Sequence, residues 1–167
     1  MMIAPLSLSN LATVAFAAIC LLTITAQARG NVVKLWRLAI PACFAAVVAF
    51  MLLAGVFEAN LESDAEWLGA AVIGIVLGRM RGWAIVVEVD QRHELVRQHR
   101  APDGPLAAIG LVLLALTDFA SAALQDPLVE PQHVAAAAAL CAGYLGGRAL
   151  AIAVRTARLP HVELHRA

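Results

Sequence analysis

The sequence predicts an all-α integral membrane protein with five transmembrane helices and a short, β-hairpin-like cytoplasmic excursion between the third and the fourth. Residues AVILMFWYC make up 62% of the 167 residues and DEKR only 14%, whereas a globular chain is about a quarter charged. Five apolar stretches approach the ~20 residues that cross a bilayer. We therefore expect one transmembrane domain over residues 1–167, with lipid as its main solvent.

The five predicted helices span residues 6–26, 38–57, 65–83, 106–124 and 134–154. The third has the weakest signal, because Arg79 and Arg81 interrupt it after a short uncharged core. A re-entrant segment is the alternative there. The first resembles a signal peptide, because Ala26-Gln27-Ala28 fits a cleavage site, yet no Lys or Arg precedes it. We expect this stretch to be retained as a helix.

The basic residues predict the orientation of the chain. All twelve Lys and Arg residues lie between the first two helices, between Arg79 near the end of the third helix and Arg100, or from Arg148 onward. The other two connections contain acidic residues and no basic ones. Under the positive-inside rule, the N-terminus is outside and the C-terminus is cytoplasmic. The expected location is the bacterial inner (cytoplasmic) membrane, with membrane lipids as partners. The balanced net charge disfavours a nucleic-acid partner.

The cytoplasmic segments comprise an excursion over residues 84–104 and a tail over residues 155–167. In the excursion, the β-branched cluster from Ile85 to Val89 and the pair Leu95 and Val96 flank four polar residues, a pattern typical of a hairpin. A helical continuation of the third helix is the alternative. Pro102-Asp103-Gly104 then predicts a turn before the fourth helix.

The third and fifth helices share the pattern G-x-x-x-G-R near their cytoplasmic ends. Small residues four apart let two helix backbones approach closely in lipid. The pattern could reflect a duplicated helical hairpin, with helices two and three matching helices four and five. We predict helix packing through Gly74, Gly78, Gly82, Gly143 and Gly147.

These features resemble the CcdC-like group of small multi-pass bacterial inner-membrane proteins. The residues that carry the resemblance are Gly78-Arg79-Met80-Arg81-Gly82, the stretch 86–96 and Gly147-Arg148. The resemblance implies the predicted architecture and no enzymatic chemistry.

Three intramembrane polar residues are candidates for chemistry: Asp118, Arg79 and Arg148. An acid inside a span is expensive unless it is protonated, paired or hydrated. Asp118 is therefore a proton or cation site, or a neutral acid that holds helices together near Thr117 and Ser121. The arginines either snorkel to lipid headgroups, pair with a buried acid, or form an anion site. A direct pair between Asp118 and Arg148 is not assumed.

The remaining reactive side chains predict little chemistry. The three cysteines lie singly in apolar runs and are expected to be buried hydrophobes. His161 and His165 have metal-ligand spacing, but lack a third ligand, and a solvated tail is the expectation. His93 and His99 are expected on a solvated surface. No catalytic motif is visible, so we expect no catalytic residue, no cofactor and no metal site.

The predicted function is that of a non-catalytic small integral membrane protein, a scaffold or accessory subunit of a membrane assembly. Its partner would be another membrane protein or a second copy of this chain. The alternative is a small oligomeric transporter, or an ion- or proton-conducting protein, that uses Asp118 and Arg148. An intramembrane enzyme is disfavoured.

Overall fold

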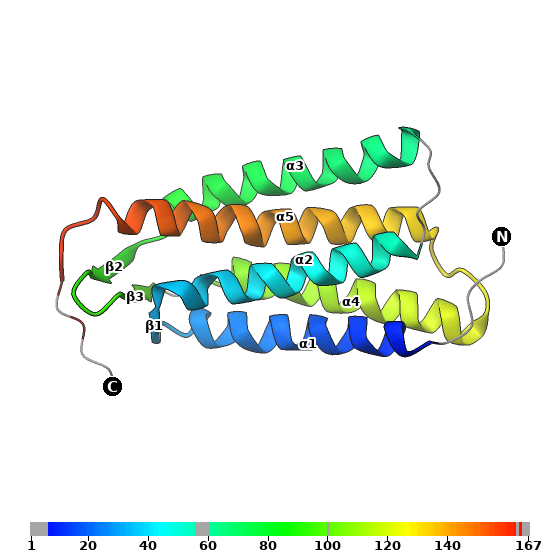
Figure 1. The fold of residues 1–167 in the computed structure, drawn as a ribbon, viewed down its shortest axis with the longest axis horizontal. Helices are drawn as coiled ribbons and strands as arrows, with labels where there is room; N and C mark the ends of the chain where they lie inside the picture. The colour runs from blue at the N-terminus through cyan, green and yellow to red at the C-terminus, as the bar shows by residue number, and fades with distance from the viewer. Residues whose placement is uncertain (1–6, 56–60, 100, 163, 165–167) are drawn as a thin grey trace.

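The computed structural model describes residues 7–55, 61–99, 101–162 and 164 of the chain. In this part of the chain, five α-helices run along one axis as a bundle, and a small sheet lies at one end of it (Figure 1). The helices are α1 (Leu8–Ala28), α2 (Ala39–Ala54), α3 (Leu61–Ala84), α4 (Asp103–Leu124) and α5 (Pro131–Thr156).

Four helical segments are long and apolar enough to cross a membrane. They are α1, the segment Leu35–Ala54 that contains α2, and the helices α4 and α5. The fifth helix, α3, has 24 residues, or roughly 36 Å at 1.5 Å per residue. Its length therefore matches a span, but it carries Asp64 and Glu66 near its start and Arg79 and Arg81 near its end. Because α3 is one uninterrupted helix, it does not turn back as a re-entrant segment would.

Helix α5 is the centre of the bundle. It packs against α3, α2 and α4, while α1 packs against α4 and α2 on the far side. The buried core is built mainly from small and aliphatic side chains, including Ala17, Val48, Leu111, Ala138 and Leu145. Many larger apolar side chains point outward, among them Leu22, Phe50, Val72 and Leu113. Small residues inside and large apolar residues outside are the arrangement expected when the solvent is lipid.

The predicted hairpin is confirmed, and the helical continuation is wrong. β2 (Val87–Asp90) pairs with β3 (Leu95–Gln98) in antiparallel register, with Val89 opposite Val96. A third strand, β1 (Val32–Lys34), adds to the free edge of β3 and leads into the 3₁₀ helix η1 (Leu35–Leu38). The sheet order is β1-β3-β2. This third strand was not predicted, because three residues between two apolar helices carry too little pattern to identify a strand.

The sheet is attached to the bundle by a second apolar cluster. Val87, Val89 and Val96 from the hairpin pack with Leu38 of η1 and Ile152 of α5. Alternate burial of this kind explains why the β-branched pattern of this segment predicts strands.

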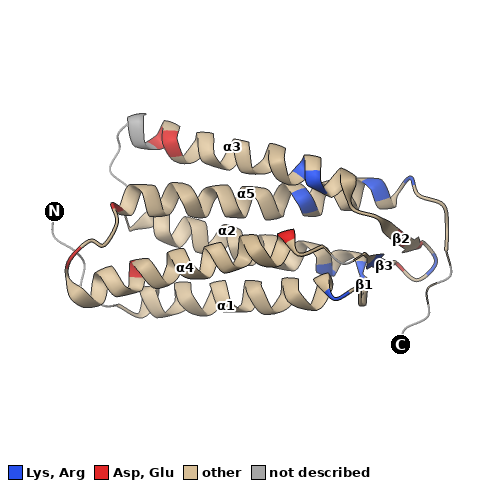
Figure 2. Cartoon of the chain, turned by 180° about the vertical axis from the view of Figure 1, so that it is seen from behind, with Lys and Arg blue, Asp and Glu red and all other residues tan. Residues whose placement is uncertain are grey.

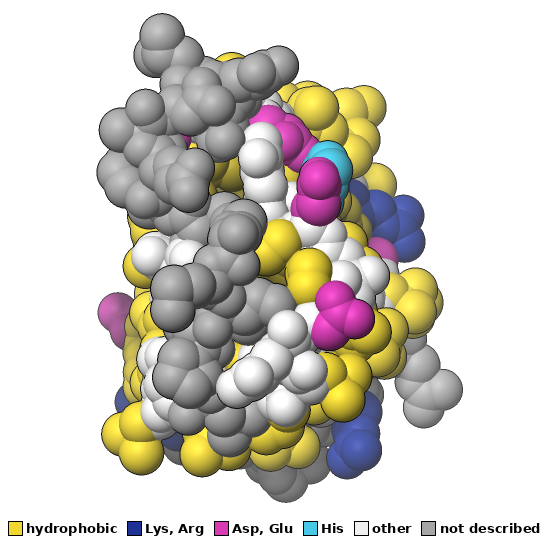
Figure 3. All heavy atoms as spheres, turned by 90° about the vertical axis from the view of Figure 1, so that its right-hand side faces the viewer, with side chains coloured by type: hydrophobic (Ala, Val, Ile, Leu, Met, Phe, Trp, Pro, Cys, Tyr) yellow, Lys and Arg dark blue, Asp and Glu magenta, His cyan; other side chains and the backbone are white. Residues whose placement is uncertain are grey.

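The basic side chains gather at one end of the molecule, where acidic ones such as Asp90 and Asp103 also lie. Figure 2 shows the Lys and Arg residues at the end that carries the sheet, and the acidic residues of the opposite end on α3, α4 and the neighbouring loop. Figure 3 views that opposite end directly, where acidic side chains and a histidine gather. Here His133 lies 3.6 Å from Glu66 and 3.2 Å from Glu130. Among the described residues, the basic side chains are therefore confined to the half of the molecule that carries the sheet, whereas acidic side chains occur at both ends.

Three local expectations are corrected by the structure. Asp103 is the first residue of α4 and does not belong to a separate turn, because Pro102 already takes the N-cap position. Cys20 is buried, but Cys43 is exposed on the outer side of α2. The pair α2 and α3 does not repeat the packed pair α4 and α5, since each of α2 and α3 packs on α5 instead.

Candidate functional site

The main polar cluster inside the described bundle is centred on Arg148 of α5. Arg148 is 3% exposed, and its guanidinium donates from Nε to Oδ2 of Asp103, at 3.1 Å. Nη2 of Arg148 donates to Oε1 of Gln98, at 3.0 Å. The Tyr144 hydroxyl, one helical turn earlier on α5, donates to the same Asp103 oxygen at 2.8 Å. The cluster therefore joins α5, the start of α4 and strand β3.

Local sequence explains how each group reaches the cluster. Tyr144 and Arg148 are four residues apart on α5 and so share one face of that helix. Asp103 begins α4, where the helix dipole favours a negative charge. Gly104 leaves space beside the guanidinium, because a Cβ there would lie 3.5 Å from Arg148 Cζ and 3.0 Å from Ile24 Cγ1. A side chain at position 104 would therefore press mainly on Ile24 and would reach the guanidinium at an ordinary contact distance.

A second arginine reaches the cluster from α3. Arg81 Nε lies 3.5 Å from Asp103 Oδ1, with the Arg81 side chain half exposed. Asp103 Oδ1 and Gln98 Nε2 are buried and have no hydrogen-bond partner among the described residues. A buried ion pair is weak evidence for net stability, but removing one partner leaves an unpaired buried charge. This cluster therefore links α3, α4, α5 and β3 through polar contacts. It contains no nucleophile-base pair.

The structure places the predicted intramembrane polar residues in three different environments. Arg148 takes the buried pair that was one of its alternatives, and its acid is Asp103. Arg79 is exposed. Asp118 is half-buried and accepts a hydrogen bond of 3.0 Å from Asn10 Nδ2 of α1. Asp118 and Arg148 are therefore not partners.

The contact of Asp118 crosses between α1 and α4. Asn10 also accepts a hydrogen bond from the Ser7 amide at 3.1 Å, so the start of α1 holds its side chain in place. Thr117 bonds to the Leu113 carbonyl of its own helix, and Ser121 accepts from the Leu128 amide. The hydroxyls near Asp118 are thus engaged elsewhere, and its described partner is the amide of Asn10.

The predicted packing glycines all lie at the contact between α3 and α5. A Cβ added at Gly74 would clash with the backbone carbonyl oxygen of Leu140, and one at Gly78 with the backbone carbonyl oxygen of Tyr144. From the other helix, Gly143 faces Ala71 and Gly147 faces Ile75 at comparable distances. Gly82 faces Ala151 and Arg148. The two backbones are so close that no other residue fits at these positions without a shift.

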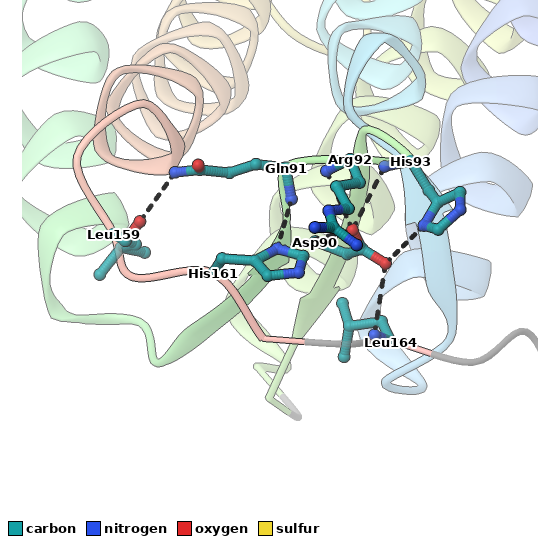
Figure 4. A network of polar contacts seen from close by, with 7 residues as sticks. All are labelled: Asp90, Gln91, Arg92, His93, Leu159, His161 and Leu164. Atoms are coloured by element: carbon teal, nitrogen blue, oxygen red, sulfur yellow. Dashed lines mark hydrogen bonds and ion pairs between the residues drawn. The ribbon is translucent and has the colours of Figure 1, made fainter.

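A second polar network ties the tail to the hairpin (Figure 4). Asp90, at the end of β2, is buried and accepts hydrogen bonds from the backbone amides of Arg92 and His93 and from the His93 ring. The side-chain hydrogen bond from His93, aided by the amides of His93 and Leu164, lowers the pKa of Asp90 to about 2. Asp90 is therefore ionised at neutral pH.

The described part of the tail is docked on the sheet, yet most of it, including His161 and Val162, stays exposed to solvent. Val162 donates from its amide to the Val89 carbonyl at 2.9 Å, and His161 forms a parallel bridge with Val89. The Gln91 amide donates to His161 Nδ1, which also lies 3.7 Å from Asp90. Leu164 is buried. The tail thus adds a short fourth segment to the sheet, alongside β2.

The predicted absence of a metal site concerns mainly this tail. His165 lies outside the described residues. Within the described ranges, no group of three His, Cys, Asp or Glu side chains is arranged to hold a metal ion. His161 instead contacts Gln91 and Asp90, as Figure 4 shows.

Sequence reasoning missed four residues of the two networks: Asp103, Tyr144, Gln98 and Asp90. A signal was present for Tyr144, the single tyrosine of the chain, because it precedes Arg148 by one helical turn. Asp103 carried a weaker one, as an acid at the start of a predicted helix. Asp90 also carried a local signal, because an Asp can accept hydrogen bonds from the turn residues that follow it, here Arg92 and His93. Gln98 had none, since its partner Arg148 lies 50 residues away.

Comparison of the chain with known protein families, with characterised proteins and with solved structures finds no match. The class of protein follows from the fold alone: a helical bundle with helices able to cross a membrane and a small sheet at one end.

Proposed function

We propose that this chain is a non-catalytic integral membrane protein that serves as a scaffold or accessory subunit of a membrane assembly. The observation that carries the proposal is the position of α3. This helix packs against α5 through glycine contacts and has no comparable contact with another described element. Its opposite face remains available to a partner helix.

The free face of α3 is apolar along its length. Val72, Ile73, Val76, Leu77 and Met80 are all about half exposed or more. These residues recur with helical spacing on the side away from α5. A surface of this kind suits contact with lipid or with another membrane helix, which would be a second protein or a second copy of this chain.

The polar residues of the bundle support a structural role over a transport path. Arg148 is engaged by Asp103 and Gln98, and Asp118 is engaged by Asn10. The two clusters also lie near opposite ends of α4, because Asp103 and Asp118 are fifteen residues apart. At 1.5 Å per residue, about 22 Å of helix separates them. A proton relay would need intermediate groups along that length.

The proposed topology has five membrane crossings, including α3, with the N-terminus outside and the sheet in the cytoplasm of a bacterium. The gathering of Lys and Arg at the sheet end supports this orientation (Figure 2). A reporter that is active only outside should work when fused at Val129 and fail when fused at Arg97. An active external reporter at Arg97 contradicts the topology.

Site-specific photocrosslinking tests the scaffold role. A photoreactive residue at Val76, on the free face of α3, should give one discrete crosslinked protein band in native membranes. The matched control is Leu113, an equally exposed apolar position on α4, which should give only lipid adducts. Equal patterns from the two positions contradict a partner on α3.

A further inference from the structure

Helices α2, α3 and α5 enclose an apolar groove of about 360 Å³. Small residues of α5 form the floor of the groove. Phe50 and Leu53 of α2 line one wall, and Trp67 and Ile75 of α3 line the other. At Gly146 an added Cβ would meet nothing within 4 Å. The side chains that line an empty groove lose dispersion contacts. Filling the groove with part of a surrounding lipid is therefore favoured.

The dimensions of the groove favour a thin occupant. Its floor runs from Ala135 to Leu150 of α5, which is roughly 22 Å at 1.5 Å per residue. One leaflet contributes about 15 Å of hydrocarbon, so the groove is long enough for an acyl chain. An acyl chain is also much thinner than a helix, which is about 10 Å wide with its side chains, and so suits a groove of this size.

A positive charge lies at the sheet end of this groove. On α3, Arg81 reaches Asp103, on the side of α5 that bears Arg148. Residues two apart on a helix point about 200° apart, so Arg79 points to the other side, where the groove lies. Arg79 follows Ile75, which lines the groove, by one helical turn. Arg79 is exposed and forms no ion pair or hydrogen bond with the described residues.

We propose that the groove binds one acyl chain of an anionic phospholipid, whose phosphate pairs with Arg79. Charge complementarity selects an anionic headgroup, and the apolar walls select the chain. The basic residues around the sheet end place this headgroup at the same interface (Figure 2). The inference is independent of the proposed scaffold role, because the groove and the free face of α3 are different surfaces.

Native mass spectrometry of the full chain in mild detergent tests the proposal. The probes are phosphatidylglycerol and phosphatidylcholine with identical acyl chains, added in equal amounts. Wild type should retain phosphatidylglycerol preferentially, as one adduct per chain. Arg79→Gln should reduce that preference about fivefold, the effect of one basic residue near the membrane surface. Arg158→Gln, an exposed arginine at the end of α5, is the matched control and should change nothing.

A second pair of variants tests the groove itself. Gly146→Leu fills the floor and should abolish retention of both lipids. Gly69→Leu is its control, because Gly69 also has open space around its Cβ position but does not line the groove. The proposal is overturned if wild type shows no headgroup preference, if Arg79→Gln and Arg158→Gln behave alike, or if Gly146→Leu retains lipid as Gly69→Leu does. Loss of a dimer in Gly146→Leu would also overturn it, assigning the groove to a second copy.

Discussion

Helices α3 and α5 carry the same short pattern, two glycines four apart followed by an arginine, and the structure uses the glycines alike and the arginines differently. Gly74 and Gly78 of α3 meet α5 as closely as Gly143 and Gly147 meet α3. Arg79 is exposed, whereas Arg148 is buried in an ion pair. The difference arises from position, because α5 has neighbours on three sides and α3 on one. A shared motif predicts a shared contact but not a shared environment.

The largest expected effect is the loss of Arg148. Arg148→Ala leaves the partly buried Asp103 with Tyr144 and the half-exposed Arg81 as its described partners, and breaking a buried pair costs up to about 3–5 kcal/mol. Arg79→Ala should stay within about 0.5 kcal/mol, the usual range for an exposed site. Denaturant unfolding in detergent measures both. Equal costs for the two variants would show that the arginines are equivalent after all.

Alanine substitutions at two glycines of α3 should change the stability of the protein in opposite directions. Gly78→Ala forces a Cβ into the Tyr144 backbone and should cost about 1–3 kcal/mol through overpacking. Gly69→Ala, on the open side of α3, should stabilise the protein by up to about 1 kcal/mol, because alanine favours helix. Thermal unfolding monitored by circular dichroism distinguishes them. A destabilisation of equal size at Gly69 contradicts the packing role of Gly78.

Asp118 should behave as a structural acid. Asp118→Asn keeps a hydrogen-bond acceptor for Asn10 and should be nearly silent in stability. Asp118→Leu removes it and should cost about 1 kcal/mol, the scale of interhelical hydrogen bonds in membranes. The same unfolding assay applies, together with ion flux in proteoliposomes. Flux that wild type shows and Asp118→Asn lacks, at unchanged stability, would favour the transporter alternative.

The smallest expected effect is local and depends on pH. Because His93 and, to a smaller extent, the Leu164 amide lower the folded pKa of Asp90 to about 2, below its ordinary value of 3.8, the ionised group stabilises the turn after β2 and, through Leu164, the docked tail above pH ~4. This contribution disappears as the pH falls toward 2. Hydrogen exchange at the Val162 amide should accelerate over that window relative to Asp90→Asn, whose side chain cannot ionise. Bundle unfolding should stay unchanged, and identical pH profiles for the two proteins contradict the assignment.

Elements with a strong local pattern could be predicted from sequence. The hairpin is an example, because the β-branched residues of 85–89 and the apolar pair Leu95 and Val96 flank four polar residues, so one local pattern marks both strands and the turn. The small residues of α3 and α5 are another, since their spacing by four predicts one face of a helix. The third strand and the docked tail had no such pattern, because each is stabilised by pairing with a strand elsewhere in the chain.

The sequence by itself determined which segments are apolar, how long they are, where the hairpin turns and at which end the basic residues gather. These properties depend on composition and on neighbours within a few residues. Only the tertiary structure decided that Arg148 is buried and Arg79 exposed, that Asp103 is the acid beside Arg148, and that Asn10 lies beside Asp118. Those pairs join residues 45 and 108 positions apart, and contacts across such distances depend on how whole helices pack.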